Sequence, residues 1–320
     1  MRRLPDATLY TNIDACLDYC RALPGAPMST DTPPTPVHFF WRGKFSAKTA
    51  FGLRSFLATQ DLARTPAVLW LEDATEFSRA AHNPHLAPLL PLIELRHFDV
   101  VREIEDTPFA SSAWVLDTDN APAASDVARL VILYRHGGIY SDLDAVFLRD
   151  LAPLLRLTAD AEFGFQWSGE PRGTHAFIRL HAGSPVANTL MERANLARSV
   201  HSTALLSYRD PLPEFLVLPV AFFSPLWLQV DGHDRSRFAP FVRFADFFRR
   251  FRWWFRVDPT RSSVENFFPG AFTYHWHGRW ALGEYRDSYA GVLDAEFNRR
   301  LRARYPTLPP VVPLGENLPP

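Results

Sequence analysis

The chain has 320 residues, of which 47% are hydrophobic, so it is long enough and apolar enough to bury a substantial core. Its formal net charge is −1, which argues against a domain that binds nucleic acid, because neutralising phosphates demands a clearly basic surface. The two cysteines, Cys16 and Cys20, are too few for a disulfide framework. Their spacing of four residues fits a packed helix face at least as well as a bridge.

Two features bear on location. The N-terminal segment lacks the apolar core of a secretory signal. The longest apolar stretch, 215–230, is shorter than the roughly 20 residues that span a bilayer, and it contains Pro219 and Pro225. The sequence therefore predicts a cytoplasmic protein in which 215–230 forms buried strand and turn.

Proline-rich segments mark the expected domain boundaries. A short helix is possible within residues 1–23, and the prolines of 24–36 discourage regular structure because proline lacks an N–H group and has a fixed φ. We expect residues 1–35 to form an N-terminal extension and linker, residues 36–300 to form the main domain, and residues 301–320 to form a proline-rich tail.

Strands and helices are predicted to alternate at the start of the main domain. Strands are predicted at 37–41 and 67–71, joined by a helix that Ser46 caps and that ends near Leu62. This is one βαβ unit, the beginning of a parallel sheet, and a third strand is predicted at 92–98. The pattern is typical of an α/β fold.

A second helix and strand lead to a pair of aspartates. We predict a helix with Ser125 as its N-cap and a glycine pair as its end, followed by a strand at 139–142. Asp142 and Asp144 then point to the same side, with Cα atoms roughly 6–7 Å apart. Two carboxylates so placed can share Mg²⁺ or Mn²⁺, ions that usually complete their shell with water and substrate phosphates.

The acidic pair alone does not decide its role. A second triplet, Asp117-Thr118-Asp119, has the same spacing and is predicted to be an ordinary turn, with Asn120 and Pro122 supplying the turn residues. A solvated acidic turn is therefore an open alternative for Asp142 and Asp144 as long as only the triplet is considered.

Further strands are predicted at 162–167 and 175–180, and a helix begins at Ser184. Phenylalanines and arginines alternate at helical spacing in 241–257, which predicts a helix. Such a helix either covers the sheet with its arginine stems or lies on an anionic membrane surface.

The segment 123–151 resembles the sugar-binding region of the family 32 glycosyltransferases, whose relatives include yeast-type mannosyltransferases and the glucosylating clostridial toxins. Two more segments, 36–43 (PVHFFWRG) and 275–280 (HWHGRW), resemble the opening strand and the C-terminal block of that family. The residues of the central segment that carry the resemblance are Ser125, Asp126, Arg129, Tyr134, Gly137, Gly138, Tyr140, Asp142 and Asp144.

The resemblance implies a GT-A fold, which is a Rossmann-like mixed sheet flanked by helices, and a set of donor contacts. It implies that Phe40 and Trp41 lie against the nucleotide base. It further implies that Asp126 and Arg129 hold sugar hydroxyls, and that Tyr140 packs against the donor sugar or phosphate.

The resemblance also implies a metal site and a catalytic group. Asp144 would bind the cation directly, and Asp142 would contact the ribose and the cation. The C-terminal block would supply Trp280 to the donor site and His275 to the metal. Together with Arg129, the two aspartates are the expected catalytic residues.

The implied reaction is a metal-dependent transfer of a hexose from a nucleotide-diphosphate donor, UDP-linked by expectation, with retention of anomeric configuration. Mn²⁺ or Mg²⁺ and the nucleotide sugar are the expected cofactor and co-substrate. The acceptor would be a hydroxyl of a glycan, a lipid-linked glycan or a protein, as in polysaccharide biosynthesis, and peripheral contact with an anionic membrane would use 241–257. No nucleic-acid partner is expected.

Three alternatives are open. Arg279 stands where many family members have a small hydroxyl residue, so the third metal ligand is His275, His277 or none. A haloacid dehalogenase-like phosphatase would use Asp142 as nucleophile and Asp144 as acid, but it normally needs a lysine downstream, and no lysine follows position 48. A non-catalytic module that binds a membrane surface or a carbohydrate is the third alternative.

Overall fold

The computed structural model describes the chain except for residues 26–27, 29–31, 117–119, 208, 252–257 and 316–320. Its strands are β1 (Val37–Trp41), β2 (Ala67–Leu71), β3 (Ile93–His97), β4 (Gly138–Ser141), β5 (Ala145–Phe147), β6 (Phe163–Gln166), β7 (Gly173–Leu180), β8 (Leu216–Leu218) and β9 (Thr273–His275).

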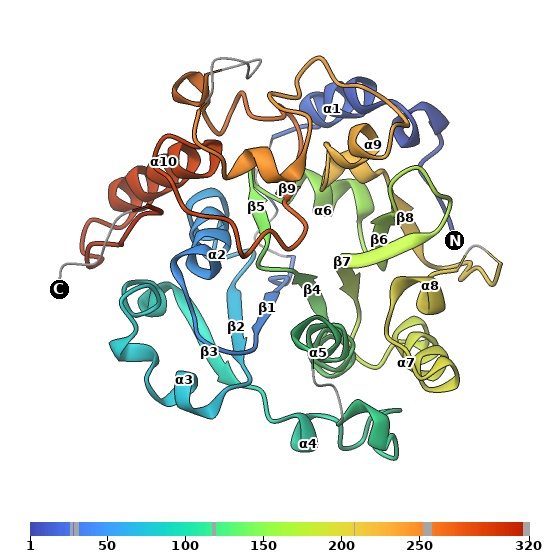
Figure 1. Ribbon diagram of the computed structural model, residues 1–320. Helices are drawn as coiled ribbons and strands as arrows, with labels where there is room; N and C mark the ends of the chain where they lie inside the picture. The colour runs from blue at the N-terminus through green and yellow to red at the C-terminus, as the bar shows by residue number, and fades with distance from the viewer. Residues whose placement is uncertain (26–27, 29–31, 117–119, 208, 252–257, 316–320) are drawn as a thin grey trace.

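Within the described residues, seven strands form one mixed sheet in the order β3-β2-β1-β4-β7-β6-β8, which runs across Figure 1. Strands β3, β2, β1 and β4 are parallel to one another. Strand β7 is antiparallel to both β4 and β6, and β8 is parallel to β6. A separate antiparallel pair, β5 with β9, lies above the main sheet in the same view.

Helices cover both faces of the sheet. The α-helices are α1 (Ile13–Ala22), α2 (Ala47–Thr59), α3 (Ala74–Ser78), α4 (Val100–Glu103), α5 (Ala121–His136), α6 (Ala152–Thr158), α7 (Pro185–Ala197), α8 (Ser202–Leu205), α9 (Trp227–Val230) and α10 (Tyr289–Arg304). The 3-10 helices are η1 (Ala7–Tyr10), η2 (Ala80–His82), η3 (Ala87–Leu92), η4 (Ala113–Val115), η5 (Val220–Phe222), η6 (Phe244–Phe247) and η7 (Pro259–Arg261).

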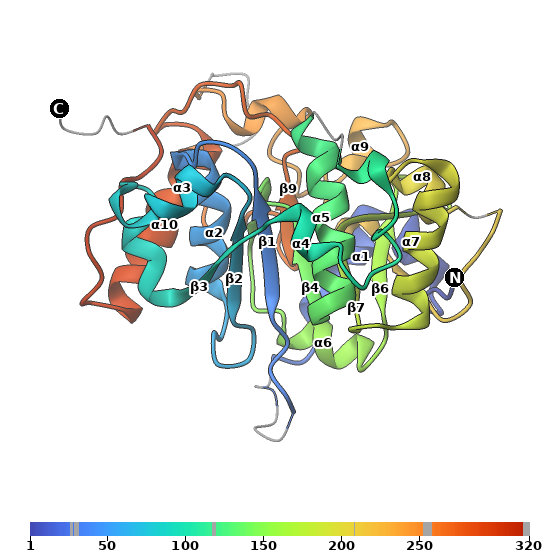
Figure 2. The ribbon, with the colours of Figure 1, turned by 90° about the horizontal axis from the view of Figure 1, so that it is seen from below.

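Successive side chains of β1 belong to two different hydrophobic cores. Phe39 belongs to a core shared with α2, α10 and α1, whereas Phe40 belongs to a second core shared with α5 and α7. Successive side chains of a strand point to opposite faces, so these cores lie on opposite sides of the sheet. Figure 1 shows α2 and α10 on one side and α5 and α7 on the other, and Figure 2 shows α5 in front of β1 and β4. The expected architecture, a Rossmann-like mixed α/β sheet flanked by helices, is confirmed.

The N-terminal helix packs onto the main core rather than projecting from it. Cys16, Leu17 and Cys20 of α1 are fully buried there, and both cysteines are free thiols. The structural interpretation of the cysteine pair is therefore confirmed. The division of the chain at residues 35 and 300 stays a prediction.

The helix before the aspartate pair begins earlier than predicted. Asn120, not Ser125, is its N-cap, and the Asn120 side chain accepts a hydrogen bond from the Ala123 N–H. Asparagine is among the best N-cap residues, and Pro122 fits the first turn because a proline needs no N–H partner there. The expected turn at 117–119 lies outside the described residues.

The predicted helix over 241–257 is wrong for 241–251, where the structure contains only the 3-10 helix η6. Phe241, Phe244 and Phe248 are buried because this segment folds onto the core instead of presenting one helical face. Residues 252–257 lie outside the described part of the chain. In the described residues, no helix is both long and apolar enough to cross a membrane.

Helix α10 has no counterpart among the predicted elements, although Ser288 caps it and Leu293, Phe297 and Leu301 follow a helical spacing of four. It packs along α2, and the two helices share a fully buried ion pair, in which Arg54 Nε donates to Asp294 Oδ1 at 2.8 Å.

The order β3-β2-β1-β4 places a topological switch between β1 and β4, because the chain leaves β1 toward β2 and β3 and then returns to add β4 on the other side. In open α/β sheets, ligands bind outside the carboxyl ends of the strands at such a switch. Trp41 is the last residue of β1, and Asp142 directly follows β4.

Candidate functional site

A cavity of about 560 Å³ opens at this switch, a size typical of small-molecule sites. Every site residue that the sequence analysis named lines it. These residues are Phe40, Trp41, Asp126, Arg129, Tyr140, Asp142, Asp144, His275 and Trp280.

Backbone contacts fix the turn that carries the two aspartates. The Asp142 N–H donates to the Ala176 carbonyl of β7 at 3.0 Å, and β5 begins directly after Asp144. Helix α2 passes so close that a Cβ on Gly52 would lie 2.2 Å from the Leu143 carbonyl oxygen. A residue larger than glycine at position 52 would therefore push this turn out of place.

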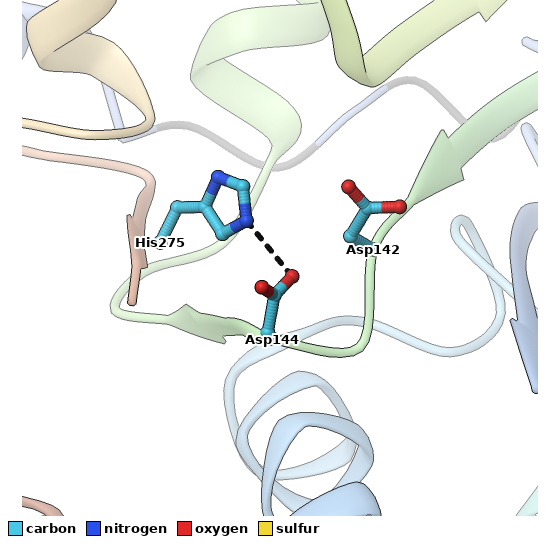
Figure 3. A group of neighbouring side chains, drawn as sticks. All are labelled: Asp142, Asp144 and His275. Carbon is cyan, nitrogen blue, oxygen red and sulfur yellow. Dashed lines mark hydrogen bonds and ion pairs between the residues drawn. The ribbon is translucent and has the colours of Figure 1, made fainter. Parts of the chain in front are cut away.

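Asp144 is held by the C-terminal block. Pairing of β5 with β9 sets Ala145 opposite His275, and His275 Nε2 lies 2.8 Å from Asp144 Oδ1 (Figure 3). The Gly278 N–H donates to Asp144 Oδ2 at 2.6 Å. Gly278 has φ +66°, a left-handed conformation in which glycine is favoured. A tight turn after β9 thus closes over the carboxylate.

Burial and charge act in opposite directions on these groups. Burial raises the pKa of Asp142 to about 7, with the Arg129 charge opposing and the Asp144 charge adding to the effect. Burial also works against ionised Asp144, but the charge and hydrogen bond of His275 bring its pKa below the ordinary value. Burial disfavours the imidazolium of His275, and the Asp144 carboxylate outweighs it and raises the His275 pKa.

Asp142, Asp144 and His275 together fit a divalent cation. One ligand atom from each lies within 4.8 Å of the others, and the three side chains converge in Figure 3. Carboxylate oxygens suit Mg²⁺ and Mn²⁺, and an added imidazole favours a transition metal such as Mn²⁺. The donor set therefore fits the cation that the sequence predicted.

His277 has different surroundings from His275, although the two rings are stacked with centroids 4.1 Å apart. Its Nε2 lies 2.9 Å from Ser224 Oγ, and burial lowers its pKa well below the ordinary value. This geometry favours His275 as the third ligand. Arg279 contributes its backbone carbonyl to Lys48.

Arg129 links α5 to the acidic pair. Its Nη2 lies 2.6 Å from Asp142 Oδ1 and 3.1 Å from Asp126 Oδ1, and its guanidinium lies over the Tyr140 ring at 4.8 Å. The Tyr140 hydroxyl is 2.9 Å from Ser125 Oγ. An arginine that is almost fully buried needs such partners, so these contacts explain its place on an apolar helix.

Two tryptophans also line the cavity. The rings of Trp41 and Trp280 are in contact, with centroids 4.8 Å apart, and both are partly exposed. Phe40 is 4% exposed and packs edge-on against Phe98, so most of its ring belongs to the core. Their roles as contacts of a nucleotide base stay predictions.

Sequence reasoning missed two residues that hold the site together. Lys48 Nζ donates to the carbonyls of Arg279, Trp280 and Leu282, and His175 contacts Arg129. Neither residue carries a motif. The signal that existed was composition, because Lys48 is one of only two lysines in the chain.

The geometry of the site does not support the phosphatase alternative, because such a phosphatase normally needs a lysine beside the aspartates. The three donors of Lys48 Nζ are committed to backbone carbonyls. The other lysine, Lys44, is exposed.

Comparisons with known proteins agree with the site. The glycosyltransferase sugar-binding region containing a DXD motif matches residues 58–161. Lactosylceramide 4-alpha-galactosyltransferase of Rattus norvegicus is 33% identical over 78 residues, which span 22% of this chain and 21% of that protein. The chain thus matches about a fifth of the length of this curated relative.

The solved structures to which the chain has some likeness include two glycosyltransferases. The PaToxG glycosyltransferase is 15% identical with a TM-score of 0.42, covering 60% of this chain and 71% of its own. The WbbM bifunctional glycosyltransferase is 15% identical with a TM-score of 0.38, covering 61% and 40%. The sequence match over 58–161 is therefore to a glycosyltransferase sugar-binding region that contains a DXD motif, and it includes both aspartates of the site.

Proposed function

We propose that the chain is a metal-dependent glycosyltransferase that moves a sugar from a nucleotide-diphosphate donor to a hydroxyl acceptor. The observation that carries this proposal is the convergence of Asp142, Asp144 and His275 in one cavity with the Asp126–Arg129 pair. The family match covers the DXD segment that contributes both aspartates.

The chemistry requires stabilisation of a leaving group. As the sugar departs, negative charge accumulates on the nucleoside diphosphate, and a bound cation acts as a Lewis acid toward that charge. Asp142, Asp144 and His275 would hold the cation. Arg129 keeps the Asp142 carboxylate oriented, and Asp126 offers an acceptor to sugar hydroxyls from the same helix.

The donor is proposed to be a UDP-linked hexose, with Phe40, Trp41 and Trp280 against the base and Tyr140 beside the sugar or phosphate. The partly exposed Trp41 and Trp280 rings support base stacking because aromatic faces stack on bases. The Asp126 carboxylate faces the cavity, so an uncharged sugar fits this side better than a uronic acid. Retention of configuration belongs to the proposal through the family resemblance.

The acceptor is proposed to be a hydroxyl of a glycan, a lipid-linked glycan or a protein, and the location cytoplasmic. Contact with an anionic membrane through 241–257 is part of the same proposal. Val242 and Phe251 are exposed in this segment, and the side chains of Arg243, Arg249 and Arg250 are at least half exposed. Apolar and basic side chains together suit an anionic interface.

A donor panel tests the reaction. Purified protein is incubated with nucleotide sugars with and without Mn²⁺, and release of free nucleoside diphosphate is measured with and without glycan acceptors. We expect release only with metal, from one donor class. Failure to bind or cleave any donor, together with hydrolysis of a phosphatase substrate, would instead support the phosphatase.

Asp144→Asn tests the metal role. The variant keeps the size of the side chain but loses one charge of the cation site, so we expect metal-dependent turnover to fall at least about 100-fold. Asp231→Asn is the matched control because Asp231 is exposed and does not line the cavity. Unchanged turnover in Asp144→Asn would refute the metal role, and Mn²⁺ titration by calorimetry provides a readout that does not depend on activity.

A further inference from the structure

The Arg129 guanidinium is contacted both from its own helix and from two neighbouring strands. Asp126 and Ser125 reach it from α5, and Asp142 reaches it from the end of β4. From β7, His175 Nδ1 forms a hydrogen bond with Arg129 Nη1. His175 is 3% exposed and does not line the cavity, so it cannot serve as a substrate contact.

The other ring nitrogen fixes the tautomer of His175. Its Nε2 lies 2.9 Å from the Val200 carbonyl oxygen, which can only accept, so Nε2 carries the proton. Nδ1 then has a free lone pair directed at Arg129, which is a donor at all working pH values. Burial, followed by the Arg129 charge, holds the pKa of His175 well below its ordinary value, so the ring stays neutral.

We propose that His175 is a positioning residue that holds the Arg129 guanidinium against Asp142. A guanidinium is planar, so fixing Nη1 through His175 also fixes the direction of Nη2, which lies 2.6 Å from Asp142 Oδ1. Without the histidine, the remaining partners of Arg129 are the carboxylates and hydroxyl near the cavity. The guanidinium would then turn toward Ser125 and Asp126 on its own helix, and Nη2 would lose its contact with Asp142 Oδ1.

This inference rests on the proposed function, because it concerns the group that orients the acidic pair. A displacement of about 1 Å at a reacting site can cost about 100-fold in rate. We therefore expect His175→Phe to lower kcat for donor cleavage by about 10- to 100-fold, as for residues that orient metal ligands. The donor KM should change less than about threefold, since the base-binding wall is untouched.

The chain provides a matched control in His38. It is 1% exposed, its Nε2 lies 3.0 Å from the Gly137 carbonyl oxygen, and its Nδ1 accepts from Trp70 Nε1 at 3.2 Å. His38→Phe therefore also leaves one carbonyl and one N–H donor unpaired in the core, but it does not touch Arg129. We expect a similar loss of thermal stability in both variants and a loss of kcat only in His175→Phe.

His175→Asn is the rescue variant because an asparagine oxygen can accept from Arg129 in place of Nδ1. Its kcat should be at least about tenfold higher than that of His175→Phe. Equal kcat in the His175→Phe and His38→Phe variants, or no recovery in His175→Asn, would overturn the proposal.

A crystal structure of His175→Phe separates this proposal from the proposed function. We expect the contact between Arg129 Nη2 and Asp142 Oδ1 to be lost, whether or not any donor is cleaved. An unchanged contact would overturn the positioning role even in an active enzyme. An inactive wild-type protein whose His175→Phe variant loses the contact would overturn only the proposed function.

Discussion

Lys48 of α2 holds the loop that carries Trp280, and Lys48→Met removes these contacts. Lys48 is 2% exposed, and its Nζ donates to the carbonyls of Arg279 at 3.1 Å and Trp280 at 2.9 Å and to that of Leu282. All three N–H donors of the ammonium are used. Methionine has a similar length but no donor, so the substitution removes the hydrogen bonds and preserves most of the packing.

The expected size of the effect follows from the three carbonyls. A carbonyl that is shielded from water and left without a donor costs about 1–3 kcal/mol, so an unmoved loop would cost up to about 9 kcal/mol. Movement of 279–282 toward water avoids most of that cost, and Trp280 moves with the loop away from Trp41. Base stacking on an aromatic ring contributes about 1–3 kcal/mol. The donor KM should therefore rise by about 5- to 150-fold, and kcat should fall less than about threefold, because binding lost equally in ground and transition states raises KM alone.

Steady-state kinetics of donor cleavage provide the assay, with Trp280→Ala measured in parallel. Lys44→Met is the matched control because Lys44 is the other lysine and is exposed. A KM for Lys48→Met within about twofold of the wild-type value, alongside a raised KM for Trp280→Ala, would refute the role of Lys48 in holding the loop. An unchanged KM in both variants would remove Trp280 from the donor site.

Other predictions address stability, pH and membranes. Arg54→Met leaves Asp294 charged and fully buried, so the free energy of unfolding in urea should fall by about 3–5 kcal/mol, and a loss below about 1 kcal/mol would contradict this. The pKa of Asp142 is raised to about 7 in the folded state but is about 4 when unfolded, so the metal-free fold binds the extra proton between these values. Its stability should therefore fall as pH rises from about 4 to 7, and Asp142→Asn should flatten that part of the profile. The protein should sediment with anionic vesicles at low salt, and Arg249→Gln with Arg250→Gln should weaken this binding; no sedimentation would exclude the membrane surface.

Local sequence patterns were sufficient to predict elements whose structure depends mainly on their own residues. Strands β1 and β2 and the start of α7 at Ser184 are confirmed because β-prone runs and N-cap residues act within a few positions. The same local logic misplaced the start of α5, where Asn120 and Ser125 both qualified as caps. Only the position of Ser125 beside Tyr140 shows that its hydroxyl has another partner.

The helical spacing of phenylalanines in 241–251 led to a wrong prediction, because these side chains are not buried on a single face. Phe241, Phe244 and Phe248 follow a helical pattern, yet the segment packs on the core from several directions and does not form an α-helix over its described residues. A periodic pattern identifies a helix only when a single face is buried. Helix α10 is the opposite case, a helix that forms although it was not predicted. It packs on α2, which lies more than two hundred residues away in the chain.

The sequence by itself determined the family segment and the residue types of the site, because a DXD pair after a strand, a preceding Asp126–Arg129 pair and a terminal His–Trp block are local patterns. Only the tertiary structure decided which of them meet. Pairing of β5 with β9 brings His275 to Asp144 across more than a hundred residues, and β7 brings His175 to Arg129. Contacts between distant segments depend on strand order and packing, which no short window of sequence encodes.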